Sequence, residues 1–119
     1  MFNGFRDNLN YQNARLEAKN QQLAMEQSLK ELEGLVREKY ISFENKFKIV
    51  NLEKENVNAA KQNLQLLQDL FNVGAASSLE FRDAQVNLAR NQANLISAKF
   101  QAKLLRIELN QLAGLLTIE

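Results

Sequence analysis

Few side chains in this 119-residue chain could take part in chemistry. The chain contains no cysteine and no histidine, which excludes thiol and imidazole relays and the usual ligand sets for zinc and haem. The spacing of its carboxylates implies no buried acid–base pair, so we expect no enzymatic activity, no metal site and no cofactor. The most distinctive polar pair is Ser77 and Glu80, spaced as in a capping box, where both side chains accept hydrogen bonds from backbone amides at a helix start.

The composition indicates that helices hold these residues in place. The chain has no proline and only 4 glycines, although turns and loops are where these two residues normally collect. Very few loops are therefore expected, and the fold class is predicted to be all-α.

The charge balance bounds the possible partners. Lys and Arg number 15 against 14 Asp and Glu, for a net charge of +1. No long-range field of one sign would attract nucleic acid or an anionic membrane. No stretch approaches the ~20 apolar residues of a membrane-spanning helix, and the first residues do not resemble a signal peptide. As written, the chain is expected to be soluble and to bind no nucleic acid.

One short segment has the residues of a turn between two helices. Gly74 can take the left-handed conformation that ends a helix, and Ser77 can cap the next one. The predicted fold is a long antiparallel, coiled-coil-like hairpin of two unequal helices. Its parts are an entering segment at 1–5, a long helix at 6–72, a tip turn at 73–77, a returning helix at 78–112 and a tail at 113–119.

The returning helix carries two apolar stripes on nearly opposite faces. The first, here called its seam, follows the alternating 3,4 spacing of a coiled coil: Phe81, Ala84, Leu88, Asn91, Leu95, Ala98, Ala102, Leu105, Leu109 and Leu112. The second stripe consists of Val86, Ala89, Ala93, Ile96, Phe100, Lys103 and Ile107. A two-helix coiled coil buries only one seam, so this helix is predicted to have a partner on each side, as in a cylinder wall.

The long helix repeats this arrangement. Its predicted seam consists of Tyr40, Phe43, Phe47, Val50, Val57 and Leu64, interrupted by Lys54 and Lys61. Its second stripe consists of Ile49, Leu52, Ala59, Leu66, Leu70 and Val73, interrupted by Asn56 and Asn63. Folding back about Gly74 leaves about thirty residues without a partner in the chain, and a lone helix of that length is marginal in water. We expect another part of a larger protein, or a second copy, to cover them.

Three segments resemble the TolC-like outer membrane efflux proteins. Residues Phe71-x-x-Gly74-x-x-Ser77-x-Leu79-Glu80-Phe81-x-Asp83-Ala84-Gln85-x-x-Leu88 are similar to the tip motif of that family. Phe2-Asn3-Gly4-Phe5-Arg6 resembles the start of its long descending helix, where the chain leaves a β-barrel. Leu109-x-x-Leu112-Ala113-Gly114-Leu115 resembles the end of the ascending helix. The three occur in the order and at the spacing that the family shows.

The resemblance implies a fragment of an α-barrel wall from the second of two internal repeats. Members of the family are homotrimeric, passive ducts through the outer membrane and periplasm, and they work with an inner-membrane transporter and a periplasmic adaptor protein. The expected location is the Gram-negative outer membrane, with the helical part in the periplasm and membrane contact made only by a β-barrel that this sequence lacks. Self-association of the isolated chain is also expected.

The resemblance also implies roles at the tip. Val73, Gly74 and Ala75 match the turn that meets the adaptor, and Phe71, Leu79 and Phe81 match tip-packing positions. Glu80 and Asp83 match acidic positions around the periplasmic entrance, where three copies of such carboxylates would favour cations. From the residues alone, Glu80 is equally well explained as a helix cap. For Asp83 the entrance role is favoured over that of a solvated side chain, because it lies past the first turn, where stabilisation by the helix dipole fades.

A different class of protein fits part of the pattern. A soluble coiled-coil hairpin scaffold, including the hairpins of periplasmic adaptors, would share the heptads and the short turn. Such a hairpin needs only one seam, whereas a duct wall needs two. The second stripe of the returning helix therefore favours the duct.

Overall fold

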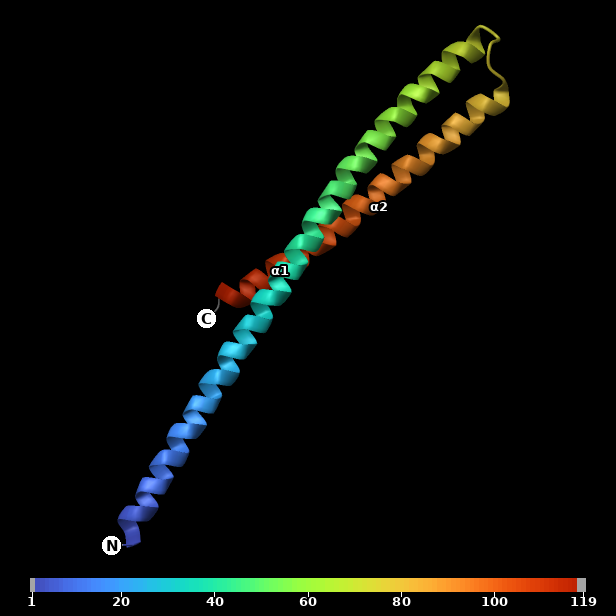
Figure 1. The fold of residues 1–119 in the computed structure, drawn as a ribbon. Helices are drawn as coiled ribbons and strands as arrows, with labels where there is room; N and C mark the ends of the chain where they lie inside the picture. Colours follow the sequence, from blue (N-terminus) through green and yellow to red (C-terminus); the bar gives the residue numbers. More distant parts are fainter. Residues whose placement is uncertain (1, 118–119) are drawn as a thin grey trace. The chain divides into compact units, whose positions relative to one another are not determined.

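The computed structural model describes the backbone of residues 2–117 and the side-chain environments of residues 3–115. Two helices make up the described chain, α1 at Phe2–Asn72 with 71 residues and α2 at Ser78–Thr117 with 40 residues (Figure 1). The predicted all-α hairpin of unequal helices is confirmed.

Both helices extend beyond the predicted bounds. The first begins at Phe2 instead of Arg6, and the second continues from Leu112 to Thr117. Gly4 and Gly114 consequently lie inside helices, and neither has a positive φ. An isolated glycine costs a helix only about 1 kcal/mol relative to alanine, so without proline nothing in these segments stops the helix. The last two residues of the predicted tail lie outside the described residues.

Contacts divide the chain into two units, the first ending at Arg37 and the second beginning at Glu38. The first unit is a single stretch of α1. Its large apolar side chains are mostly exposed, among them Leu9, Leu16 and Leu23 at seven-residue spacing. The second unit contains the rest of α1, the turn and α2, and it holds every buried side chain of the described residues.

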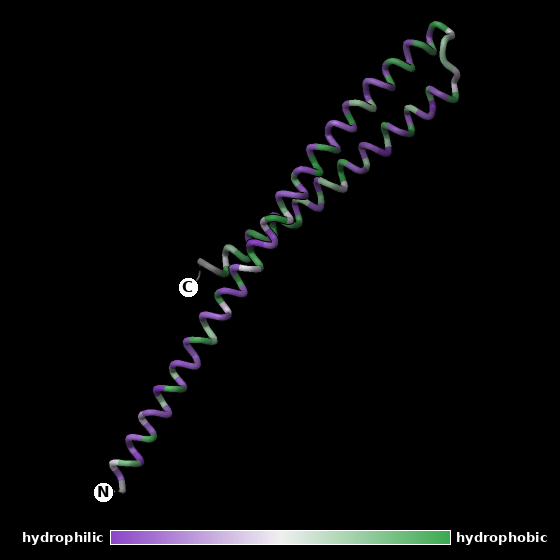
Figure 2. The backbone as a smooth tube through the Cα atoms, viewed as in Figure 1, coloured by the Kyte–Doolittle hydropathy of each residue, from purple (hydrophilic) through white to green (hydrophobic). Residues whose placement is uncertain are grey.

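The seam predicted for α2 is the face that packs on α1. All ten of its residues, from Phe81 to Leu112, are buried or half-buried. A small core forms where Val50 of α1 meets Ala98 and Ala102 of α2, with Leu95 packed against it. Figure 2 shows apolar residues recurring along both helices. Because most of the buried residues are alanines, the core is thin and depends on close fit more than on area.

The seam predicted for α1 was only half correct. Phe43, Val50, Val57 and Leu64 are buried or half-buried as predicted, but Tyr40 and Phe47 are 54% and 52% exposed. The other positions of the seam each lie one residue before the predicted set. They are Lys39, Lys46, Glu53, Ala60 and Leu67.

The shifted seam has a physical reason. It places Ala60 and Leu67 against α2 and leaves the ammonium groups of Lys54 and Lys61 exposed. The half-buried lysines keep polar partners at their ends, because the Nζ atom of Lys39 lies 3.0 Å from Oε2 of Glu108. Likewise, Lys46 donates a 2.8 Å hydrogen bond to Oε1 of Gln101. Long lysine stems cover apolar surface while their charged ends reach polar groups.

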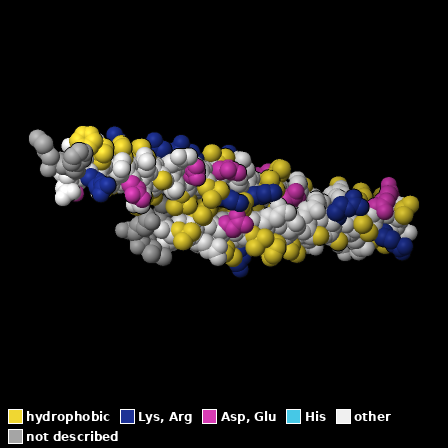
Figure 3. Space-filling view, turned by 90° about the horizontal axis from the view of Figure 1, so that it is seen from below, with side chains coloured by type: hydrophobic (Ala, Val, Ile, Leu, Met, Phe, Trp, Pro, Cys, Tyr) yellow, Lys and Arg dark blue, Asp and Glu magenta, His cyan; other side chains and the backbone are white. Residues whose placement is uncertain are grey.

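The second stripes of both helices lie at the surface of this unit. On α2, Ile96 and Phe100 are 69% and 61% exposed. On α1, Ile49, Leu52 and Leu66 are exposed, although Leu70 is half-buried. Figure 3 shows hydrophobic side chains at the surface among charged ones. Each helix therefore has one covered apolar face and one uncovered apolar face.

The turn ends α1 in a Schellman arrangement. Gly74 has φ of 76°, the one positive φ among the described residues. The Ala75 amide donates to the Leu70 carbonyl at 2.8 Å, and the Gly74 amide donates to the Phe71 carbonyl at 3.0 Å. These two bonds satisfy carbonyls that the helix end would otherwise leave unpaired.

Replacing Gly74 with alanine should destabilise the hairpin, whereas the same change at Gly34 should stabilise it. A side chain at a left-handed position costs roughly 1–2 kcal/mol. Gly34 lies inside α1 with nothing within 4 Å of an added Cβ, so alanine there should gain up to about 1 kcal/mol. Urea denaturation followed by circular dichroism measures both. Shifts of the same sign would contradict this account of the turn.

Candidate functional site

Two aromatic rings flank the turn at the tip of the hairpin. Phe71 at the end of α1 stacks on Phe81 in the first turns of α2, with ring centroids 5.6 Å apart and an interplanar angle of 14°. Between them Val73 and Ala75 are exposed, and Leu79 is 66% exposed and outside the stacked pair. The stack holds the two helix ends together, while the turn presents small apolar side chains to the surroundings.

The predicted capping box starts α2. The Ser77 amide donates to Oε2 of Glu80 at 2.7 Å, and the Ser77 hydroxyl donates to the same oxygen at 3.0 Å. In return, the Glu80 amide donates to Oγ of Ser77 at 3.2 Å. The backbone hydrogen bond from Ser77, followed by the bond from its hydroxyl, lowers the pKa of the Glu80 carboxyl below its ordinary value. Glu80 is therefore held in place as a charged cap.

Asp83 is the second carboxylate expected at this end of α2. Its side chain is exposed, and it makes no hydrogen bond or ion pair with any residue that the structure describes. The two acidic residues thus differ in freedom, because one is tied to the turn and the other is solvated.

Two grooves along the hairpin were not foreseen from the sequence. One, of about 470 Å³, is lined by Phe43, Phe47, Ala102, Lys103, Arg106, Ile107 and Asn110. The other, of about 280 Å³, is lined by Asn56, Ala59, Ala60, Asn63, Asn87 and Asn91. Each combines residues from both helices, so only the register of the seam brings them together. The asparagines spaced seven residues apart on α1 gave a partial signal for the second groove. Which residues of α2 line the groove with them can be known only once the register of the seam is known.

Asn91 is the one polar residue in the seam of α2. It is half-buried, and its side-chain amide donates to the carbonyl of Asn87 at 3.0 Å. The hydrogen bond stays within α2 and does not cross to α1. Asn91 therefore lies at the edge of the second groove, the one lined by asparagines. It has no partner on α1 that would fix the register of the two helices.

Other types of site were sought in the described part of the chain. Between residues 2 and 117 no group of three His, Cys, Asp or Glu side chains is placed to hold a metal ion. Within the same range, neither helix has a stretch apolar enough to cross a membrane.

Each helix of this hairpin has a covered seam and an uncovered apolar stripe, which leaves apolar surface that further helices could cover. The sequence profile of the outer membrane efflux protein family matches residues 1–115. The chain belongs to this family, which makes it a component of outer-membrane efflux and of transport. Members generally form trimeric channels that work with adaptor and pump proteins. Neither the curated proteins nor the solved structures contain a match to the chain.

Changing Glu80 to glutamine should flatten the acid dependence of hairpin stability. The pKa of Glu80 is lowered in the folded chain, so its charge stabilises the fold above the ordinary glutamate value of about 4.3. That contribution is lost as the pH falls below this value and through the lowered pKa. Thermal unfolding between neutral pH and the acid range should show wild type losing more stability than the glutamine variant.

Asp83→Asn is the matched control for this prediction. It removes a carboxylate one turn away that makes no bond to the described residues. The dependence of thermal stability on pH should therefore stay close to that of wild type. Parallel curves for wild type and Glu80→Gln would show that the charge of Glu80 does not stabilise the folded hairpin.

Proposed function

We propose that this hairpin forms part of the wall of a passive trans-periplasmic duct, through which an inner-membrane pump exports its substrates with the help of a periplasmic adaptor. Membership of the outer membrane efflux family supports a transport role. The main support for a place in a duct wall is the second apolar stripe, which is exposed on both α1 and α2. A free-standing hairpin scaffold or an adaptor hairpin would have no use for it.

The assembly proposed is a homotrimer, as in the family generally, and the stripes support copies that lie side by side within it. In such a ring, the second stripe of α2 would pack on a helix of the next hairpin, as its own seam packs on α1. Burial of apolar area at about 25 cal/mol per Å² is the dominant force available for this contact, because the net charge is near zero.

The tip would be the end that meets the adaptor. Val73, Gly74 and Ala75 form the contact turn in this proposal, with Phe71, Leu79 and Phe81 as supporting packing. Glu80 and Asp83 would lie around the entrance, where carboxylates repeated in each copy attract cations. Fixing of the turn by the Gly74 conformation and the capping box supports this assignment, since a preformed tip loses less entropy on binding.

The proposal is tested by the ion selectivity of a complete trimeric channel that contains this hairpin. In planar bilayers, the combined change Glu80→Gln and Asp83→Asn should lower the preference for cations over anions severalfold, since each copy loses two charges at the entrance. Glu108→Gln serves as the control, because that carboxylate lies far along α2 and pairs with Lys39. Unchanged selectivity in the double variant would refute the entrance role.

A further inference from the structure

The near-neutral charge of the chain conceals an uneven distribution on the hairpin. Two rows of residues flank the seam, one on each side. The row here called the basic rim takes every seventh residue and consists of Tyr40, Phe47, Lys54, Lys61 and Gln68 on α1 and Gln85, Gln92, Lys99 and Arg106 on α2, all exposed. It contains four basic residues and no acidic one.

The opposite rim has a different character. It consists of Ser42, Ile49, Asn56, Asn63 and Leu70 on α1 and Glu80, Asn87, Asn94, Gln101 and Glu108 on α2. This side contains two acidic residues and no basic one. The two grooves confirm that these are two separate flanks, because one joins Phe47 to Arg106 and the other joins Asn63 to Asn87.

One pair of cations in the basic rim lies across the seam from each other. The groove brings Phe47 beside Arg106, and the helices run antiparallel, so seven residues further along each helix Lys54 comes beside Lys99. Like charges in such positions repel. In a two-helix coiled coil with no further partner, one of these two positions would be expected to carry a carboxylate that pairs with the lysine at the other.

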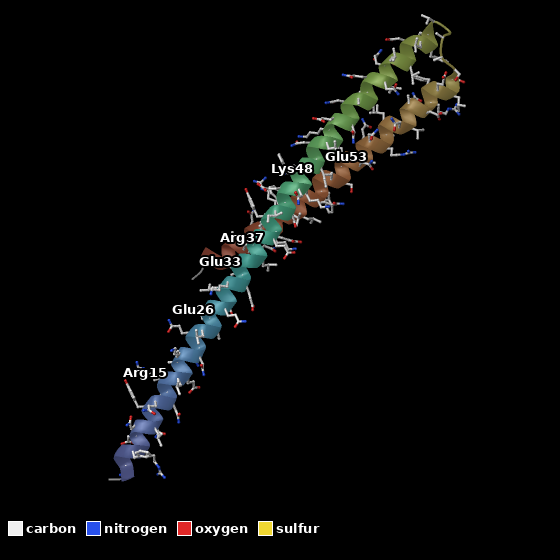
Figure 4. The ribbon with its side chains drawn as sticks, in the orientation of Figure 1. Arg15, Glu26, Glu33, Arg37, Lys48 and Glu53 are labelled. Carbon is white, nitrogen blue, oxygen red and sulfur yellow. The ribbon has the colours of Figure 1, made fainter. Side chains whose placement is uncertain are left out.

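No carboxylate among the described residues pairs with this row. In residues 3–115 the one ion pair joins Lys39 to Glu108 and lies on the other flank. Lys54, Lys61, Lys99 and Arg106 make no hydrogen bond or ion pair with described residues. Figure 4 shows the side chains projecting all along the helices, with Glu53 labelled on α1. Glu53 is half-buried in the seam and accepts a hydrogen bond from Asn56.

The basic rim continues into the apolar groove of about 470 Å³. Phe43, Phe47 and Ile107 give the groove an apolar lining, and Lys103 and Arg106 stand among them. The surface therefore combines a slot for apolar side chains with a row of cations. Lys54 and Lys61 are seven residues apart, about 10.5 Å along the helix, a spacing that a second helix lying alongside matches with one carboxylate every two turns.

We propose that the basic rim and the adjoining groove bind an acidic amphipathic helix of a partner protein, laid lengthwise along the hairpin. Apolar side chains of that helix enter the groove, and its carboxylates pair with Lys54, Lys61 and Lys99. The surface shares only Lys103 and Ile107 with the second stripe of α2. The inference does not require the duct, and it holds for the hairpin whether or not the hairpin stands in a wall.

The test measures binding of the whole chain to a labelled synthetic helix by fluorescence anisotropy. The probe has about four heptads, with leucine along one face and glutamate on both borders of that face. A copy with glutamine at every glutamate is the neutral probe. The rim variant Lys54→Gln, Lys61→Gln, Lys99→Gln is compared with the matched variant Lys19→Gln, Lys30→Gln, Arg90→Gln, which removes the same charge from exposed positions outside the rim and the groove. Circular dichroism checks that all remain helical.

The expected result is that the acidic probe binds and that the rim variant binds it roughly tenfold more weakly, as loss of three partly exposed ion pairs implies. The matched variant should stay within about twofold of wild type, and the neutral probe should bind more weakly than the acidic one. The proposal is overturned if both variants lose affinity equally, or if the neutral probe binds as well as the acidic one.

Other occupants of the rim give distinct outcomes. If vesicles containing phosphatidylglycerol bind with the same dependence on the rim, the surface is a general anion site and the proposal fails. If the rim variant changes the sedimentation of the chain alone, a second copy covers this face and the proposal also fails. Neither outcome affects the ion selectivity of the assembled channel. The duct proposal is therefore tested independently of this one.

Discussion

Replacing Val50 with aspartate should lower the free energy of unfolding of the hairpin by on the order of 3 kcal/mol. Val50 is 5% exposed and forms the core cluster with Ala98 and Ala102 of α2. An aspartate there would be removed from water with no cationic partner in the cluster. The alanines and the Leu95 side chain packed against the cluster are apolar, so they offer the carboxylate no hydrogen bond.

The neighbouring residue provides the control. Ile49 is 40% exposed on the second stripe, so Ile49→Asp introduces the same charge and nearly the same loss of helix propensity without burying a carboxylate. At protein concentrations where the chain is monomeric, this variant should unfold within about 0.5 kcal/mol of wild type. Equal destabilisation of the two variants in urea titrations would mean that the seam does not hold the hairpin together.

The sequence was sufficient to locate the seam of α2 because every one of its positions but Asn91 is apolar. With ten positions at 3,4 spacing, no other rotation of the helix buries as many apolar side chains. On α1 the pattern is weaker, since polar residues occupy several positions of either possible seam. The choice between Tyr40 and Lys39 then depends on contacts with Glu108 and on the thin alanine layer, which a single-helix pattern does not contain.

The turn at the tip and the start of the second helix could be predicted from local chemistry alone. Gly74, Ser77 and Glu80 act within a few residues of one another, so their roles as helix end and capping box follow from spacing. The grooves and the basic rim could not be predicted in the same way. They arise where residues of two helices meet, and an error of one residue in the seam of α1 moves Lys54 and Lys61 from the rim into the core.

Residues in the second stripe of α2 should control self-association of the chain. Changing Ile96 and Phe100 together to glutamine should weaken association by about two orders of magnitude. Both side chains are largely exposed, and fully burying one such side chain contributes about 1.5–3 kcal/mol, of which only part is lost here. Sedimentation velocity across a concentration series measures the change, with wild type expected to associate at on the order of tens of micromolar.

The matched control for this variant is Leu104→Gln with Leu115→Gln. These leucines are also exposed on α2, but they lie outside the second stripe, so the variant should associate like wild type. Neither variant should change unfolding of the monomer, because none of the four side chains belongs to the seam. If wild type stays monomeric throughout the series, or if both variants dissociate alike, the stripe is not an assembly surface. Dissociation of the stripe variant alone would separate the two apolar faces of α2, one that closes the hairpin and one that joins hairpins together.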